Sequence, residues 1–177
     1  MTVTIRPTAE QDLPELLGLY AELHPDDPAV PAADAAVIWQ QIAAQEGRTI
    51  LVAERDGTVA GTADCTVLPN LTRGGRPFLL IENVVVAAAC RRRGIGARLL
   101  AAAVDLAASA GCYKAQLMSR DSRAEAHAFY QSCGFAPAAQ GFRRYLPAAT
   151  GHVPSSGHVP SGIGVLEQGA AQVRQQP

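Results

Sequence analysis

A β-branched run that leads directly into an arginine- and glycine-rich turn constrains this chain more than any other feature. The run is Val84-Val85-Val86 within IENVVVAAACRRRGIG, residues 81–96, and its composition is typical of a buried strand. The turn is followed by the helix-forming stretch ARLLAAAVDLAASAG. The first N–H groups of a helix have no internal partner and lie at the positive end of its dipole. A basic turn at that point therefore predicts a site for a pyrophosphate group.

The spacing of the glycines distinguishes between classes of ligand. A dinucleotide fold requires G-x-G-x-x-G, but leucine stands at the third position, and the P-loop pattern G-x-x-x-x-G-K-S/T is absent from the sequence. Residues 91–96 read R-x-x-G-x-G. This pattern resembles the acetyl-coenzyme A signature, Q/R-x-x-G-x-G/A, of the GNAT superfamily of N-acetyltransferases.

The resemblance implies that acetyl-CoA is the acetyl donor, with its pyrophosphate on the turn and its pantetheine arm paired to the backbone of the preceding strand. The residues expected to hold it are Val84, Val85, Val86, Arg91, Arg92, Arg93, Gly94, Ile95 and Gly96. Family members often carry proline where Ala88 stands, which affects only the expected rigidity of the turn.

A second motif resembles the same family. Ala126, Phe129, Tyr130, Gly134 and Phe135 fit the pattern A-x-x-F-Y-x-x-x-G-F. In GNAT enzymes this tyrosine commonly protonates the coenzyme A sulfur, so the resemblance implies that Tyr130 is the general acid, the alternative being a tyrosine that only packs its ring. Family members often have asparagine where Arg123 stands, and we expect Arg123 to reach the 3′-phosphate of the nucleotide instead.

Glu82 is the best candidate for the base that deprotonates an amine. Alternation with period two places it on the same face of the strand as Val84 and Val86, and a carboxylate in an apolar run is costly unless it is paired or functional. The alternative is a structural ion pair with Arg73 or Arg76. Asn83 is expected on the opposite face, unless a bulge re-aims it.

The loop after the first long helical segment holds His24, Asp26 and Asp27. In this fold that loop commonly lines the acceptor side, and clustered acids would attract a cationic amine. A solvated turn is an equally good interpretation.

Periodicity and turn residues predict an alternation of strands and helices. Strands are expected at 3–6, 49–55, 58–68, 78–86 and 113–118, with closing strands at Ala136 and 142–146, and helices at 10–23, 34–47 and 94–110 and after Ser122. Asp34 is expected to cap the second helix, and Ser122 with Glu125 to form a capping box for the last. The order predicts a mixed α/β (α+β) fold with a central, mostly antiparallel sheet and helices on both faces. It is similar to the GNAT fold over residues 1–147.

Composition excludes several other classes. A net charge of −1 over 177 residues argues against a nucleic-acid binder. The four cysteines show no zinc spacing, so no metal is expected. The N-terminus lacks an apolar leader, and Arg98 and Asp105 interrupt the alanine-rich helix, so neither secretion nor a membrane span is expected. We expect a cytoplasmic protein.

The segment 148–177 differs in kind from the rest. It contains the tandem repeat GHVPSSGHVPSG and too little apolar sequence to form a core, so we expect a low-complexity tail that is mobile or bound to a partner. Its histidines are expected in a solvated linker rather than at a metal.

The sequence as a whole predicts an enzyme that moves an acetyl group from acetyl-CoA to a primary amine, expected to belong to a small molecule, by direct transfer. The alternatives are a protein or peptide N-acetyltransferase and a non-catalytic acetyl-CoA-binding regulatory module. No sequence feature identifies the acceptor, because loops build its pocket. A homodimer remains compatible with the sequence.

Overall fold

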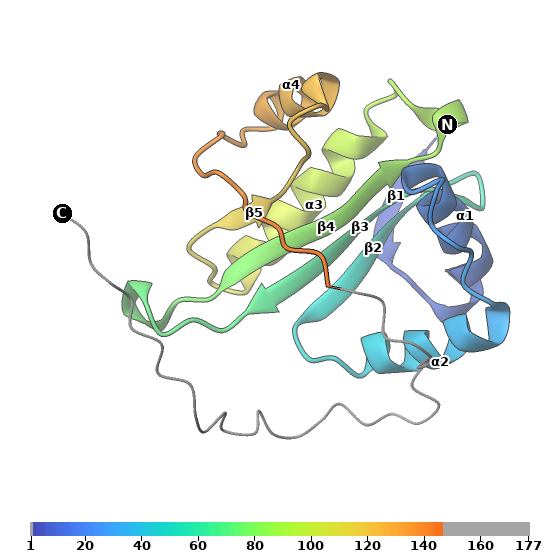
Figure 1. Cartoon of the computed structure of the whole chain (residues 1–177), viewed down its shortest axis with the longest axis horizontal. Helices are drawn as coiled ribbons and strands as arrows, with labels where there is room; N and C mark the ends of the chain where they lie inside the picture. The colour runs from blue at the N-terminus through green and yellow to red at the C-terminus, as the bar shows by residue number, and fades with distance from the viewer. Residues whose placement is uncertain (1, 147–177) are drawn as a thin grey trace. The chain divides into compact units, whose positions relative to one another are not determined.

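Five strands form one sheet in the computed structural model, which describes residues 2–146 (Figure 1). Across the sheet they follow the order β1 (Val3–Pro7), β2 (Arg48–Arg55), β3 (Thr58–Leu68), β4 (Phe78–Val86) and β5 (Ala115–Leu117). The first four pair antiparallel, and β5 runs parallel to β4. This confirms the predicted mixed, mostly antiparallel sheet.

In the described part of the chain, four α-helices cover both faces of the sheet (Figure 1). They are α1 (Leu13–Leu23), α2 (Ala32–Ala43), α3 (Ile95–Ser109) and α4 (Ala124–Ser132), and short 3₁₀ turns occur at η1 (Glu10–Asp12), η2 (Arg73–Gly75) and η3 (Ala88–Cys90). Apolar side chains of α3 and α4 enter one core cluster, and those of α1 enter another on the opposite face. Helices on both faces were predicted, and the structure confirms them.

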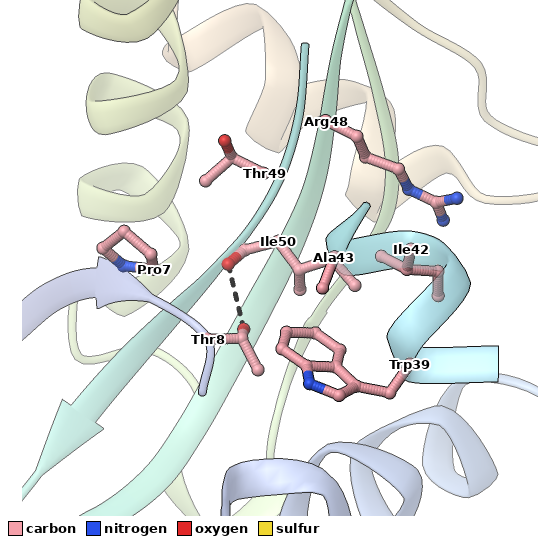
Figure 2. Close-up of a pocket in the computed structure, with 8 residues that line it drawn as sticks. All are labelled: Pro7, Thr8, Trp39, Ile42, Ala43, Arg48, Thr49 and Ile50. Atoms are coloured by element: carbon pink, nitrogen blue, oxygen red, sulfur yellow. Dashed lines mark hydrogen bonds between the residues drawn. The ribbon is translucent and has the colours of Figure 1, made fainter. Parts of the chain in front are cut away.

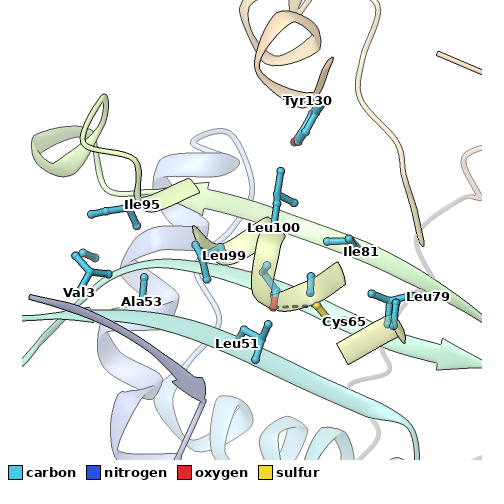
Figure 3. Close-up of a cluster of buried hydrophobic side chains, with 14 residues drawn as sticks. Val3, Leu51, Ala53, Cys65, Leu79, Ile81, Ile95, Leu99, Leu100 and Tyr130 are labelled. Atoms are coloured by element: carbon cyan, nitrogen blue, oxygen red, sulfur yellow. Dashed lines mark hydrogen bonds between the residues drawn. The ribbon is translucent and has the colours of Figure 1, made fainter. Parts of the chain in front are cut away.

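The larger core cluster lies between the sheet and α3. Leu99 and Leu100 of α3 are buried against Leu79 and Ile81 of β4, and Tyr130 closes the cluster from the α4 side (Figure 3). Burying side chains of this size contributes roughly 1.5–3 kcal/mol each. The cluster therefore fixes α3, and with it the turn that precedes α3, against β4.

Two helices begin at other residues than their capping patterns predicted. The second helix begins at Ala32, after Pro31, so Asp34 lies inside its first turn. The last begins at Ala124, with Arg123 in the cap position and no side-chain cap bond. A turn closed by the Arg123 N–H donating to the Arg120 carbonyl (3.0 Å) delays the helix by one residue. Ser122 therefore does not cap it, and the predicted capping box is wrong.

The predicted closing strands are also wrong. Within residues 2–146 no strand follows β5, and the predicted strand 113–118 is reduced to Ala115–Leu117. Phe142, Tyr145 and Leu146 are 90%, 76% and 80% exposed. These aromatic and aliphatic residues favour a strand, but within the described residues no strand pairs with this segment, and a strand needs a partner and a covered face to be stable. The predicted tail, 148–177, lies outside the described residues.

Candidate active site

The parallel strands β4 and β5 separate after three residue pairs, from Leu79 with Ala115 to Ile81 with Leu117. In the described part of the chain, β4 has no strand partner on this side beyond Ile81. A cavity of about 100 Å³ lies there, lined by the end of α1, the middle of β4, the segment after β5, and α4. Glu82, Val84, Arg123 and Tyr130, all predicted site residues, share this cavity.

A β-bulge interrupts β4 at the cavity. Glu82 lies opposite Asp64 of β3, but Val85 lies opposite Thr62, so β4 has one more residue than β3 between these two pairs. Asn83 absorbs the extra length with a φ of 51°, a left-handed conformation that asparagine tolerates better than most residues. A bulge in this strand was one of the two possibilities considered for Asn83, and the structure contains it.

The bulge changes which face Glu82 shares. Directly opposed residues of an antiparallel pair lie on one face, so Glu82 lies on the face of Asp64, and Val85 packs with α1. Val84 and Val86 pack into the cluster on the α3 face. The prediction that Glu82 shares a face with these two valines is wrong, because alternation with period two fails across a bulge.

Glu82 forms no ion pair with any residue of the described range. Arg76 instead donates to the carbonyls of Gly111 (3.3 Å) and Cys112 (2.9 Å). Arg73 lies over the Tyr113 ring, 5.8 Å from its centroid. The two arginines proposed as structural partners are thus engaged elsewhere.

A buried ion pair lies next to Glu82 on the sheet. Asp64 is 4% exposed and accepts two hydrogen bonds from the Arg48 guanidinium, one of them from Nε at 3.0 Å. On the same side, burial, with Asp64 as the second cause, raises the pKa of Tyr20 to about 12. Because Arg48 neutralises Asp64, Glu82 is the carboxylate that remains available to a ligand in the cavity.

Tyr130 projects from α4 with 9% of its surface exposed. Its ring packs against Phe129 (centroids 5.4 Å apart) and Phe135 (6.5 Å). Burial raises the pKa of its phenol, and the positive charge of Arg123 opposes this shift. Within residues 2–146 the phenol makes no hydrogen bond. It is a protonated group at the cavity wall, which suits a proton donor.

The glycine turn lies beyond the end of β4 and does not line this cavity. Gly94 stands in the N-cap position of α3 with a φ of 77°, and no side chain caps the helix. Arg92 also has a positive φ, 59°. The first turn of α3 therefore has backbone N–H groups that no N-cap side chain satisfies, and the binding of an anion there stays a prediction.

Gly96 has a packing role that the sequence analysis did not consider. A Cβ at this position would lie 2.9 Å from the ring of Phe129 on α4. Absence of a side chain here lets α3 and α4 pack closely, whereas around Gly94 a Cβ would meet nothing within 4 Å. A bulky residue at 96 would first displace α4, whereas a side chain at Gly94 meets no neighbour but strains the backbone, so a test at Gly94 must measure stability beside coenzyme A binding.

The three arginines of the turn are not equivalent. Arg91 donates from Nε to the Val86 carbonyl (3.0 Å), and its Nη2 lies 3.5 Å from Glu22 Oε2 on α1. Arg92 and Arg93 are exposed and form no ion pair with a described residue. Arg91 therefore braces the turn, and the other two offer uncompensated charge.

The cavity contains residues that the sequence analysis missed. Arg120, Arg143 and Ser119 line it together with the predicted Arg123. The Ser119 hydroxyl is buried without a hydrogen-bond partner among the described residues, although buried polar groups normally have one. Nothing in the local sequence signals these positions except the unusual density of arginine in SRDSR and FRR.

Arg123 and His24 both line the cavity between β4 and β5. Arg123 lies in the cavity wall near Tyr130, rather than at the pyrophosphate turn. His24 also lines the cavity, as the acceptor-side interpretation of its loop predicted, whereas Asp26 and Asp27 do not. The cavity lining then carries three arginines and one glutamate, an excess of two positive charges with His24 neutral.

A second hollow, of about 240 Å³, lies between α2, the end of β1 and the start of β2 (Figure 2). Trp39 and Ile42 form its α2 side, and Thr8 crosses to β2 by donating to the Ile50 carbonyl (2.9 Å). Its one charged residue, Arg48, is engaged by Asp64. This hollow holds no group for proton transfer.

Residues 2–146 contain no cluster of three side chains that could hold a metal ion. No helix in that range is long and apolar enough to cross a membrane.

Comparisons with known proteins agree with this geometry. A model of the acetyltransferase (GNAT) family matches residues 13–135. A probable glucosamine 6-phosphate N-acetyltransferase 2 of Oryza sativa subsp. japonica is 36% identical over 113 residues, covering 61% of this chain and 66% of the relative. The glucosamine 6-phosphate N-acetyltransferase of Trypanosoma brucei brucei is 38% identical over 79 residues, covering 45% and 52%. The chain thus spans about two thirds and about half of these curated relatives.

One solved structure agrees with this chain over most of its length. It comes from Agrobacterium tumefaciens strain C58 and is named provisionally as an acetyltransferase. It has a TM-score of 0.79 and 40% identity, and it covers 81% of this chain and 99% of its own. The chain belongs to the GNAT family of acetyltransferases.

Proposed function

We propose that this protein transfers the acetyl group of acetyl-CoA directly to the primary amine of a small, anionic molecule. The observation that carries the proposal is the cavity where β4 and β5 separate, because it holds an unpaired carboxylate, Glu82, and a buried phenol, Tyr130. A transfer from a thioester to an amine requires one proton acceptor and one proton donor at the same place.

Donor binding is assigned to the turn and to β4. The pyrophosphate lies on the N-terminus of α3, where Gly94 leaves the backbone accessible and Arg92 and Arg93 add charge. The pantetheine arm pairs with the edge of β4 that β5 leaves free, along Val84–Val86. A backbone N–H of this edge then polarises the acetyl carbonyl.

The residues divide the proton transfers between them. Glu82 accepts a proton from the ammonium of the acceptor, directly or through water. The amine nitrogen then forms a bond to the acetyl carbon, the carbon–sulfur bond breaks, and the nitrogen loses its second proton to solvent as the neutral amide forms. Tyr130 gives its proton to the departing thiolate, and burial supports this role because it keeps the phenol protonated.

The charge of the cavity supports an anionic acceptor. Arg120, Arg123 and Arg143 face a single carboxylate, and arginine recognises phosphate through paired hydrogen bonds. Two relatives are named for glucosamine 6-phosphate, which carries an amine and a phosphate. We therefore propose a phosphorylated amino sugar as the acceptor class.

The test is release of free thiol from acetyl-CoA by purified protein with four acceptors: glucosamine 6-phosphate, glucosamine, an aminoglycoside and a peptide with a free N-terminus. We expect the first to be preferred over the second by about tenfold or more in kcat/KM, the order of one lost charge-assisted contact. Arg120→Gln and Arg143→Gln should reduce that preference. Arg144→Gln is the matched control, because Arg144 is exposed and does not line the cavity.

Other outcomes would replace the proposal. Preference for the peptide would make the protein a peptide N-acetyltransferase. Coenzyme A binding without thiol release over all four acceptors would favour a regulatory module. Equal rates with glucosamine and its phosphate would contradict the role of the arginines.

We propose the cytoplasm as the compartment, because all four cysteines are free, as in reducing compartments. A homodimer and a dispensable tail after about residue 148 remain our expectations, and the oligomeric mass of the full chain and of a truncated chain would test both.

A further inference from the structure

One carboxylate joins the end of α1 to the turn that precedes the anion site. Glu22 Oε2 accepts a hydrogen bond from the Ala88 backbone N–H at 2.9 Å and lies 3.5 Å from Arg91 Nη2. The two contacts span 66 and 69 positions of sequence, and they add a polar link to the apolar packing of Leu19 against Val85 and Ala87. Arg91 is fixed in turn by its bond to the Val86 carbonyl.

The position of Glu22 in α1 gives these contacts a second consequence. The next two residues, Leu23 and His24, line the cavity between β4 and β5. The end of α1 therefore contacts the turn between β4 and α3 through Glu22, and it lines the cavity through Leu23 and His24. The α1–α2 loop begins immediately afterwards.

The turn is also held on either side of Ala88. The Ala87 N–H donates to the Ala60 carbonyl (2.9 Å), and Cys90 packs against the larger core cluster and accepts from Arg55 Nη1 (3.7 Å). Ala88–Cys90 form a single 3₁₀ turn, in which the Cys90 N–H donates to the Ala87 carbonyl (2.8 Å). Glu22 holds the first N–H of this turn, so it contributes to the orientation of the turn before any ligand arrives.

We propose that Glu22 is a positioning residue that couples the pyrophosphate turn to the α1 wall of the acceptor cavity. It orients the turn through Ala88 and neutralises Arg91, so that binding of the donor's pyrophosphate also orders the end of α1. The inference rests on the proposed function, because it takes coenzyme A to be the molecule that binds the turn.

The experiment measures two quantities on the full chain with coenzyme A as probe. Calorimetry gives the dissociation constant, and hydrogen–deuterium exchange over residues 19–31 gives the protection that coenzyme A induces at the end of α1. Glu22→Ala removes both contacts. Ala88→Pro removes only the N–H donor, and the extended backbone of Ala87 (ψ 133°) accepts a following proline.

Two further variants serve as rescue and control. Glu22→Gln retains an oxygen that accepts from Ala88 and should bind coenzyme A within about twofold of wild type. Asp27→Ala removes an exposed acidic side chain shortly after α1 that does not contact the turn, and it should behave as wild type. Thermal melts without ligand show that each variant is folded.

We expect Glu22→Ala and Ala88→Pro to weaken coenzyme A binding by about threefold to tenfold, the order for one partly exposed hydrogen bond to a charged group. Both should abolish the induced protection at residues 19–31. Unchanged affinity, or protection that survives in Glu22→Ala, would overturn the proposal. Tighter binding by both Glu22 variants would show that the carboxylate mainly repels the pyrophosphate, which also overturns it. Failure of wild type to bind coenzyme A would instead refute the proposed function.

Discussion

Replacing Tyr130 by phenylalanine removes one oxygen atom from the cavity wall and leaves the packing of α4 in place. The ring contacts with Phe129 and Phe135, at 5.4 and 6.5 Å between centroids, do not involve the hydroxyl. The phenol makes no hydrogen bond to a residue within 2–146, so no partner is left unpaired. The free energy of unfolding should therefore change by less than about 0.5 kcal/mol, the usual range for changes that disturb no packing or buried polar group.

Turnover should respond far more strongly. Loss of a proton donor typically lowers the rate by about 10²–10⁴-fold, which corresponds to roughly 2.7–5.4 kcal/mol of activation free energy. Coenzyme A affinity should stay near wild type, because the anion site lies at the start of α3. The assay is thiol release at saturating acetyl-CoA and glucosamine 6-phosphate, with a viscosity series to show that product release is not limiting.

The pH dependence gives a second readout of the same group. Burial raises the pKa of Tyr130 above the ordinary tyrosine value of about 10, and a general acid works only while protonated. Activity of the wild type should therefore persist to pH values at which an exposed tyrosine ionises. Wild-type kcat in Tyr130→Phe, with chemistry limiting, would refute the reasoning and make Tyr130 a packing residue.

Three further predictions concern other parts of the chain. Glu82→Gln should lower kcat/KM and remove the acidic limb of its pH profile, and retention of that limb would exclude Glu82 as the base. Gly94→Val forces a β-branched residue to a φ of 77°, so it should lower the free energy of unfolding by roughly 1–3 kcal/mol. It should also weaken coenzyme A binding. Urea unfolding measures the first effect and calorimetry the second, and an unchanged affinity would argue against the turn as the pyrophosphate site. Hydrogen bonds from Arg6 lower the pKa of Asp12, so this carboxylate stabilises the fold above about pH 4 and its contribution is lost as the pH falls through the lowered value. Arg6→Met should flatten the loss of stability in acid, and identical acid titrations of the two proteins would contradict this.

The sequence predicted those elements whose stabilising interactions are local. The Asp56-Gly57 turn appears with φ values of 53° and 80°, because the residues that favour such a hairpin lie within the turn itself. The start of α3 was placed within one residue by its glycines. Tyr130 was found because its motif implies a role, and Glu82 because a carboxylate within an apolar run is costly unless it is paired or functional. The structure places both at one cavity.

Features that depend on distant partners were missed. The extra residue of β4 can be recognised only once the pairing of β4 with β3 is known. Period-two alternation, which assumes a strand without a bulge, therefore placed Glu82 on the wrong face. Phe142, Tyr145 and Leu146 are residue types that favour strands or cores, but they are exposed, because a strand requires a pairing partner that the local sequence does not reveal. Arg120 and Arg143 enter the site from segments without regular structure, where no periodicity exists to place a side chain.

Gly96 ties the spacing of two helices to the absence of one side chain. It belongs to the first turn of α3, which we propose to receive the pyrophosphate, and Phe129 precedes Tyr130, which we propose to meet the sulfur. A Cβ at position 96 would lie 2.9 Å from the Phe129 ring, so any side chain here would push α4 away from α3. Under the proposed function, the distance between the two ends of the donor site therefore depends on this one position.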